Sequence, residues 1–128
     1  MNTATTLINA ATLTAAAEQA VGASVVDLNA ITVNDIIIEA SATSGATSPG
    51  NGRFVDVYFA FASAPLSSNV PITLWPSAQK IRVLLATEAN GVRVAMSDVV
   101  TKKARYGYVW YSHENLDSTV SLTVKMIS

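Results

Sequence analysis

The chain has 128 residues, half of them apolar, a formal net charge of −1 and no cysteine. This length suits a single domain with its own hydrophobic core, and the lack of cysteine excludes disulfide bonds and thiolate metal sites. The small net charge and the absence of an apolar run of about 20 residues argue against a protein drawn to nucleic acid or embedded in a membrane. The first residues lack a basic stretch followed by a continuous apolar run, so we expect no secretory signal and a soluble protein.

The surface of the folded chain is expected to carry few charges. Charged residues make up 13% of the sequence, against about 25% in average soluble proteins. A folded chain of this mass exposes roughly 6,500 Å², so much of that area must be neutral or apolar. We interpret this as a surface that is partly buried against other chains. A surface that is merely rich in threonine, serine, asparagine and alanine is the alternative.

Residues 1–24 are rich in alanine and threonine and are expected to form an extended N-terminal arm that lies on a neighbouring subunit. Threonine and β-branched residues favour extended backbone here, although the alanines within residues 12–21 also permit a short helix. The apolar residues Leu7, Ile8 and Leu13 are candidate contacts of this arm. Residues 25–128 would then form the folded domain.

After Gly22, apolar and polar residues alternate, which is the pattern of strands with one buried face. The clearest such segments are residues 36–41, 53–62, 80–86, 91–97, 104–112 and 120–126. A further short strand is predicted at residues 72–75, where Pro76 ends it. Residues 44–52 and 64–71 are dominated by loop-forming residues.

Asn90 and Gly91 separate two of these segments, and both residue types accept the positive φ angles of a hairpin turn. We therefore expect residues 80–86 and 91–97 to pair as a β-hairpin. In the second of these strands, Val92, Val94 and Met96 share one face.

About seven or eight strands at intervals of about 8–12 residues, without an alternation of strands and helices, predict an all-β fold. The most suitable architecture is an antiparallel β-sandwich, jelly-roll-like, with an extended N-terminal arm.

Few residues are available for catalysis or metal binding. The single histidine, His113, lies in a predicted turn, where we expect it to be solvated. A Ser-His-Asp arrangement would have to use Ser112 or Ser97 with Asp117, but no G-x-S-x-G motif marks a nucleophile. The nine acidic residues are scattered, and neither metal-ligand spacing nor a phosphate-binding loop is present. The sequence therefore predicts a protein that is not an enzyme and holds no metal or cofactor.

A basic and aromatic segment follows at residues 102–111. Basic groups beside aromatic rings can hold single-stranded nucleic acid, but we do not expect this because the rest of the chain supplies no basic stripe. Aromatic residues on one strand face more commonly fill a core or an interface, and Trp75 is a candidate anchor of the same kind. The complete set of candidate interface residues is Leu7, Ile8, Leu13, Trp75, Tyr106, Tyr108 and Trp110.

Three segments give the chain an overall resemblance to a known group: the opening TATTLINAATLTAAAEQAVGASVVDLNA, the strand FVDVYFAFASA after the loop SGATSPGNG, and the final strand STVSLTVKMIS. The chain resembles, over nearly its full length, small virion proteins of tailed bacteriophages, in particular capsid decoration (cement) proteins. This resemblance implies a non-enzymatic β-sandwich protein that forms a homo-oligomer, with a trimer favoured. It would be made in the host cytoplasm and bind the major capsid protein or other virion subunits.

Two alternatives remain open from the sequence. One is a tail, baseplate or fibre component of the same kind of particle. The other is a carbohydrate-binding β-sandwich module, in which Trp75, Trp110 or Tyr111 would face solvent and stack on a sugar.

Overall fold

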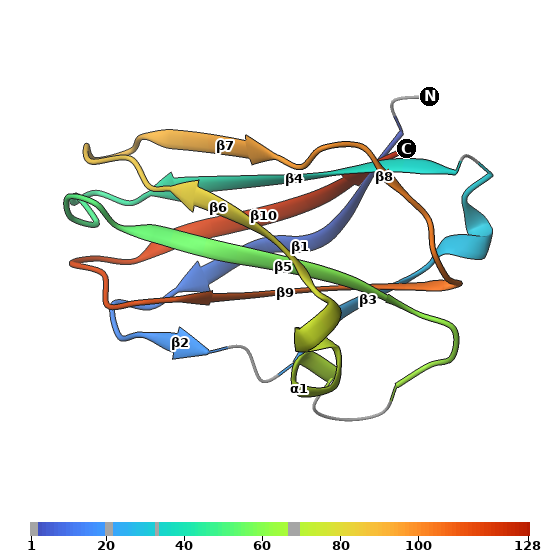
Figure 1. Cartoon of the computed structure of the whole chain (residues 1–128). Helices are drawn as coiled ribbons and strands as arrows, with labels where there is room; N and C mark the ends of the chain where they lie inside the picture. The colour runs from blue at the N-terminus through green and yellow to red at the C-terminus, as the bar shows by residue number, and fades with distance from the viewer. Residues whose placement is uncertain (1–2, 20–21, 33, 67–69) are drawn as a thin grey trace.

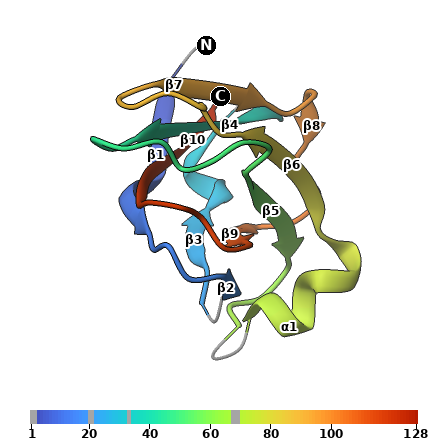
Figure 2. The ribbon, with the colours of Figure 1, turned by 90° about the vertical axis from the view of Figure 1, so that its left-hand side faces the viewer.

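The computed structural model describes residues 3–19, 22–32, 34–66 and 70–128, and it is a sandwich of two antiparallel sheets (Figures 1 and 2). The predicted all-β sandwich is confirmed. The strands are β1 (Ala4–Leu13), β2 (Glu18–Gln19), β3 (Ser24–Asp27), β4 (Asp35–Ser44), β5 (Phe54–Ala62), β6 (Gln79–Leu84), β7 (Val92–Met96), β8 (Val100–Thr101), β9 (Tyr106–His113) and β10 (Val120–Ile127). The helical elements are η1 (Leu28–Ala30), α1 (Val70–Leu74) and η2 (Trp75–Ser77).

The strand order is that of a jelly roll. The first sheet runs β1-β10-β4-β7, and β8 also pairs with β4. The second sheet runs from β3 or β2 through β9 and β5 to β6. Along the chain, β1, β4, β7 and β10 enter the first sheet and β3, β5, β6 and β9 the second, so most connections cross between layers. Two interleaved sheets of this kind define the double Greek key of jelly-roll domains.

The core lies between the two sheets and follows directly from the alternating pattern. Val120, Leu122, Val124 and Met126 of β10 all point inward and expose no more than 2% of their surface. Within the first sheet, small residues lie beside large ones, since Ala42 and Ala40 of the neighbouring strand β4 are paired with Leu122 and Val124. Each fully buried aliphatic side chain of this kind contributes about 1.5–3 kcal/mol, so the buried faces of the long strands supply the main stabilisation.

The N-terminal segment is extended, as expected, but it is a strand of the sandwich rather than an arm that leaves the domain. β1 pairs with β10 from Ala4 opposite Ile127 to Leu13 opposite Val120. Leu13 is completely buried and Ile8 is 9% exposed. The physical reason is that β1 pairs with the backbone groups at the edge of β10, which would otherwise lack partners. The side chains of Ile8 and Leu13 pack into the core at the same time. The residues at positions 20–21 lie outside the described ranges.

Two local expectations were wrong. Residues 80–86 and 91–97 do not form a hairpin, because β6 pairs with β5 and β7 pairs with β4 in the other sheet. Leu85 and Ala86 are buried where the chain crosses between the layers, which favours the crossing over local pairing. The predicted strand at residues 72–75 is helical, with Pro71 in the first turn, where its missing N–H is tolerated. Within the described ranges, no helix is long and apolar enough to cross a bilayer.

Candidate assembly surface

Strand β7 turns its large apolar side chains to solvent. Val92, Val94 and Met96 expose 52%, 56% and 53% of their surface. Their neighbours across the ladder are polar residues on the outer face of β4: Thr43, Ser41 and Glu39. Large side chains at alternate positions normally mark the buried face of a strand, so this arrangement leaves an apolar stripe without a partner. We call Val92–Met96, with its side chains and backbone, the β7 edge.

The backbone of the β7 edge is open as well. Ser44 N–H donates to Gly91 O at one end of the β4–β7 ladder, and Ser97 N–H donates to Ile38 O at the other, both over 2.9 Å. Backbone groups in an antiparallel ladder point alternately toward and away from the neighbour, so those of Arg93 and Ala95 face β4. The N–H and C=O groups of the three exposed apolar residues therefore face away from the sheet, and β7 ends the strand order (Figure 2).

The other sheet edges carry features that discourage pairing with another chain. At the far end of the first sheet, β1 is interrupted by two register shifts, and Ala10 has a φ of 50°. In the second sheet, one edge is divided between the short strands β2 and β3. The opposite edge, β6, displays Lys80 and Arg82. Only the β7 edge, among these described edges, combines regular backbone with uncharged outward side chains.

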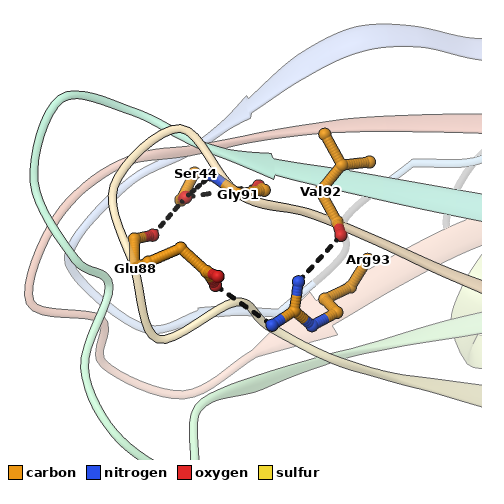
Figure 3. A network of polar contacts seen from close by, with 5 residues as sticks. All are labelled: Ser44, Glu88, Gly91, Val92 and Arg93. Carbon is orange, nitrogen blue, oxygen red and sulfur yellow. Dashed lines mark hydrogen bonds and ion pairs between the residues drawn. The ribbon is translucent and has the colours of Figure 1, made fainter.

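A polar network in the crossing turn holds β7 in place (Figure 3). The hydroxyl of Ser44, at the end of β4, donates to Glu88 O over 2.7 Å and accepts from Gly91 N–H over 2.8 Å. Asn90 takes a φ of 55°, and its N–H donates to Gly45 O over 2.8 Å. Because these bonds fix both sides of the turn to the end of β4, β7 starts in a defined register.

The same network balances the charge of the one basic residue on the strand. Arg93 Nη2 lies 3.0 Å from Glu88 Oε1, and Arg93 Nη1 donates to Val92 O over 3.0 Å (Figure 3). The only charged residue of β7 is therefore neutralised by its own chain. Its guanidinium also covers one carbonyl of the open backbone.

The aromatic residues predicted as interface contacts are instead mostly covered by the chain itself. Tyr108 and Trp110 expose 3% and 1% of their surface on the outer side of the second sheet. The segment that leads through α1 and η2 lies over them, and Leu66 N–H donates to the hydroxyl of Tyr108 over 3.0 Å. Trp75 is half-buried, with its ring 4.6 Å from that of Tyr58 and 6.0 Å from that of Trp110. This forms a second small core rather than an open contact surface.

The remaining predicted interface residues are dispersed. Ile8 and Leu13 belong to the main core, and Leu7 packs against it while half-buried. Tyr106 is half-buried at the start of β9, with the guanidinium of Arg105 5.1 Å from its ring. The structure does not bring these residues together into one surface.

His113 is buried, not solvated as expected for a turn. Its Nδ1 lies 2.7 Å from Glu114 O, and because a carbonyl only accepts, Nδ1 carries the proton. Its Nε2 lies 3.5 Å from Glu18 Oε2, and the hydroxyl of Thr14 donates to the other oxygen of that carboxylate over 2.6 Å. Backbone pairing joins β2 to β9 here, with Glu18 opposite His113, beside a shallow hollow that Asp56 also lines.

The residues considered for a catalytic triad have other partners. Asp117 pairs with Arg53 at 3.2 Å, Ser97 Oγ donates to Asp98 O, and Ser112 Oγ lies 3.4 Å from the hydroxyl of Tyr58. In the described part of the chain, no three histidine, aspartate or glutamate side chains converge in the manner of a metal site.

The basic residues before β9 bind the segment around η1. These residues are Lys102, Lys103 and Arg105, and Lys102 and Arg105 make the contacts. Lys102 Nζ donates to Ile31 O, at the end of η1. Arg105 forms a two-bond ion pair with Asp27, with donor–acceptor distances of 3.3 and 3.0 Å. The hydrogen bond from Arg105, together with the N–H of Asn29, holds the pKa of Asp27 below its ordinary value. On β9 itself, burial raises the pKa of Tyr111.

No protein-family model and no curated protein matches the chain. The arrangement of the described residues therefore carries the functional argument. Its most distinctive feature, the β7 edge, was missed in the sequence. Alternation groups Val92, Val94 and Met96 on one face of the strand, but it does not show that this face meets solvent rather than the core.

Proposed function

We propose that the protein is a non-enzymatic structural component of a virion, specifically a capsid decoration protein of a tailed bacteriophage. It would be made in the host cytoplasm and act as a homo-oligomer on the major capsid protein. The observation that carries this proposal is the β7 edge, which presents regular open backbone and three exposed apolar side chains together. Such an edge is a template for pairing with another chain.

The jelly-roll order and the surface composition support the same role. Jelly rolls occur in viral capsid proteins as well as in lectins and cupins, so the fold is compatible with the proposal but does not decide it. With 13% charged residues, the surface opposes close packing of copies only weakly. On a symmetric shell, contacts that are weak singly become strong together because each subunit is held at several points. The resemblance favours a trimer, whereas the open edge at β7 favours a two-fold contact between copies.

Immunogold labelling tests the location. Antibodies raised against the purified chain would be applied to phage particles from the source culture, with particles from an unrelated phage as control. We expect regular labelling of the head. Labelling confined to the tail, baseplate or fibres would move the protein to that part of the particle, and particles without label would overturn the virion proposal.

A carbohydrate-binding role is the second candidate, and one observation favours it. Trp75 and Tyr58 are half-buried and form a tilted pair, with ring centroids 4.6 Å apart, on the outer side of the second sheet. Partly exposed aromatic pairs can stack on sugars, although Trp110 cannot contribute because it is 1% exposed. A glycan array probed with wild type and Trp75→Ala tests this role. No binding at millimolar sugar would eliminate it, and binding lost in the variant would establish it.

A further inference from the structure

We propose that two copies of the chain pair through their β7 edges, antiparallel and about a two-fold axis at Val94, so that the first sheet continues from one copy into the other. This inference rests on the assembly role proposed above and names its contact. The partner is a second copy of this chain, and the interface is the β7 edge itself.

The open backbone of β7 is self-complementary. The outward N–H and C=O groups belong to Val92, Val94 and Met96, which are evenly spaced about the central residue. In an antiparallel pair centred on Val94, that residue faces Val94 of the second copy, and each end residue faces the opposite end residue. Each facing pair can then exchange both backbone hydrogen bonds, and no outward group in the strand is left over.

The side chains match in the same register. All three apolar side chains lie on the outer face of the first sheet, so pairing would place Val92 beside Met96 of the second copy and Val94 beside its own symmetry mate. Apolar side chains facing one another across an antiparallel ladder stabilise the pairing. The result is a continuous apolar stripe across the two-fold axis.

The charges near β7 do not oppose a second copy. Arg93 is held by Glu88 at 3.0 Å within one chain, so pairing does not bring unbalanced like charges together along the strand. The guanidinium of Arg93 also bonds Val92 O over 3.0 Å. Pairing would replace this bond with a backbone bond from the second copy, so no polar group has to be left without a partner.

A copy of β7 fits this edge better than any other described edge of the same chain. The β1 edge has shifted register, β2 and β3 are short, and β6 carries Lys80 and Arg82. Pairing like with like also gives a closed two-fold contact, whereas joining unlike edges gives either a ring or an open fibre.

Disulfide trapping of Val94→Cys tests the register. The chain has no cysteine of its own, so any disulfide must join the introduced thiols. Residues in a hydrogen-bonded antiparallel pair have Cα atoms about 5.5 Å apart, within the range that a disulfide spans. The matched control is Val25→Cys, because Val25 on β3 is 57% exposed against 56% for Val94. With copper phenanthroline as the oxidant, we expect covalent dimers of Val94→Cys to form at least roughly tenfold faster than those of the control. Equal rates, or no dimer of Val94→Cys, would overturn the proposal.

Solution mass provides the second measurement. Sedimentation of the wild-type chain should show a species of twice the 13.4 kDa chain mass that dissociates on dilution. Val94→Lys should remain monomeric at the same concentrations, because two like charges would meet at the axis, whereas Val25→Lys should behave like wild type. Since both positions are exposed, the variants should keep the wild-type circular dichroism spectrum. Two results would overturn the β7 pairing. One is a solution mass that is the same for wild type and Val94→Lys, and the other is a stable trimer.

These outcomes separate the pairing from the proposed function. Trapped dimers together with unlabelled phage particles would leave the pairing intact and overturn the virion role. Labelled particles without trapped dimers would leave the virion role intact and overturn the pairing.

Discussion

Arg82 and Asp56 lie opposite each other on β6 and β5 and form a two-bond ion pair, with Nε–Oδ1 at 2.9 Å and Nη2–Oδ2 at 3.1 Å. The carboxylate is largely buried, while the guanidinium is partly exposed and lies 3.7 Å from the ring of Phe54. The pair thus satisfies a buried charge and also keeps a charged group on the β6 edge.

Removing only one member of this pair should destabilise the fold more than removing both members. Arg82→Met keeps the aliphatic contact with Phe54 but leaves the carboxylate of Asp56 without its partner, and an unpaired buried charge is costly. We expect a lower urea midpoint for Arg82→Met than for the double variant with Asp56→Asn. Equal midpoints would show that solvent already satisfies the carboxylate.

The ion pair of Asp27 and Arg105 makes a pH-dependent contribution. Because the hydrogen bond from Arg105 lowers the pKa of Asp27 in the folded state, the folded chain binds fewer protons than the unfolded chain near the ordinary value of about 3.9. The stabilisation is present above that value and is lost as the pH falls through the lowered folded pKa. Asp27→Asn should therefore melt slightly below wild type at pH 7, and the difference should vanish in strong acid. A difference that does not change between pH 7 and acid would contradict this.

Gly50 and Gly52 provide a matched pair of loop substitutions. Both have positive φ angles, 109° and 68°, but a Cβ at Gly50 would lie 2.6 Å from Asp117 Oδ2, whereas a Cβ at Gly52 meets nothing within 4 Å. Gly52→Ala should cost about 1 kcal/mol for its left-handed backbone, and Gly50→Ala should cost more because Asp117 must also move. Equal losses in chemical denaturation would mean that this carboxylate moves freely.

The core and the surface should respond differently to the same truncation. Leu122 is fully buried, and Leu84 is 64% exposed at the end of β6. Leu122→Ala should destabilise the fold by about 2–5 kcal/mol, whereas Leu84→Ala should change it by less than about 0.5 kcal/mol. Denaturant unfolding measures both. A large loss in Leu84→Ala would show that this side chain is covered in solution.

The strands could be predicted because each buried face repeats every second residue, as in Val120–Met126. Their pairing could not, since partners are chosen over long distances in the sequence. Asn90 has the positive φ angle of a hairpin turn, yet the chain uses it to bond Gly45 and cross between sheets. Likewise, the shifts of register in β1 break its apolar alternation, which is why residues 1–24 resembled an arm. Deleting them would remove a strand of the sandwich.

The candidate site was harder to predict than the fold. Alternation shows which residues share a face but not which face meets the core, so the exposure of Val94 was not visible in the sequence. Conversely, Tyr108 and Trp110 were expected at an interface, because nothing local reveals that α1 and its flanking residues cover them. In both cases, the deciding factor is the position of a distant segment.

The most direct test of the account is residue-resolved amide hydrogen exchange across β7. In a single chain, the N–H groups of Arg93 and Ala95 bond β4, whereas those of Val92, Val94 and Met96 face solvent. If copies pair through this edge, exchange at Val94 should slow as the protein concentration rises, and Val94→Lys should abolish the slowing at positions 92 and 96. Fast exchange at all three outward amides, unchanged with concentration, would contradict assembly through β7.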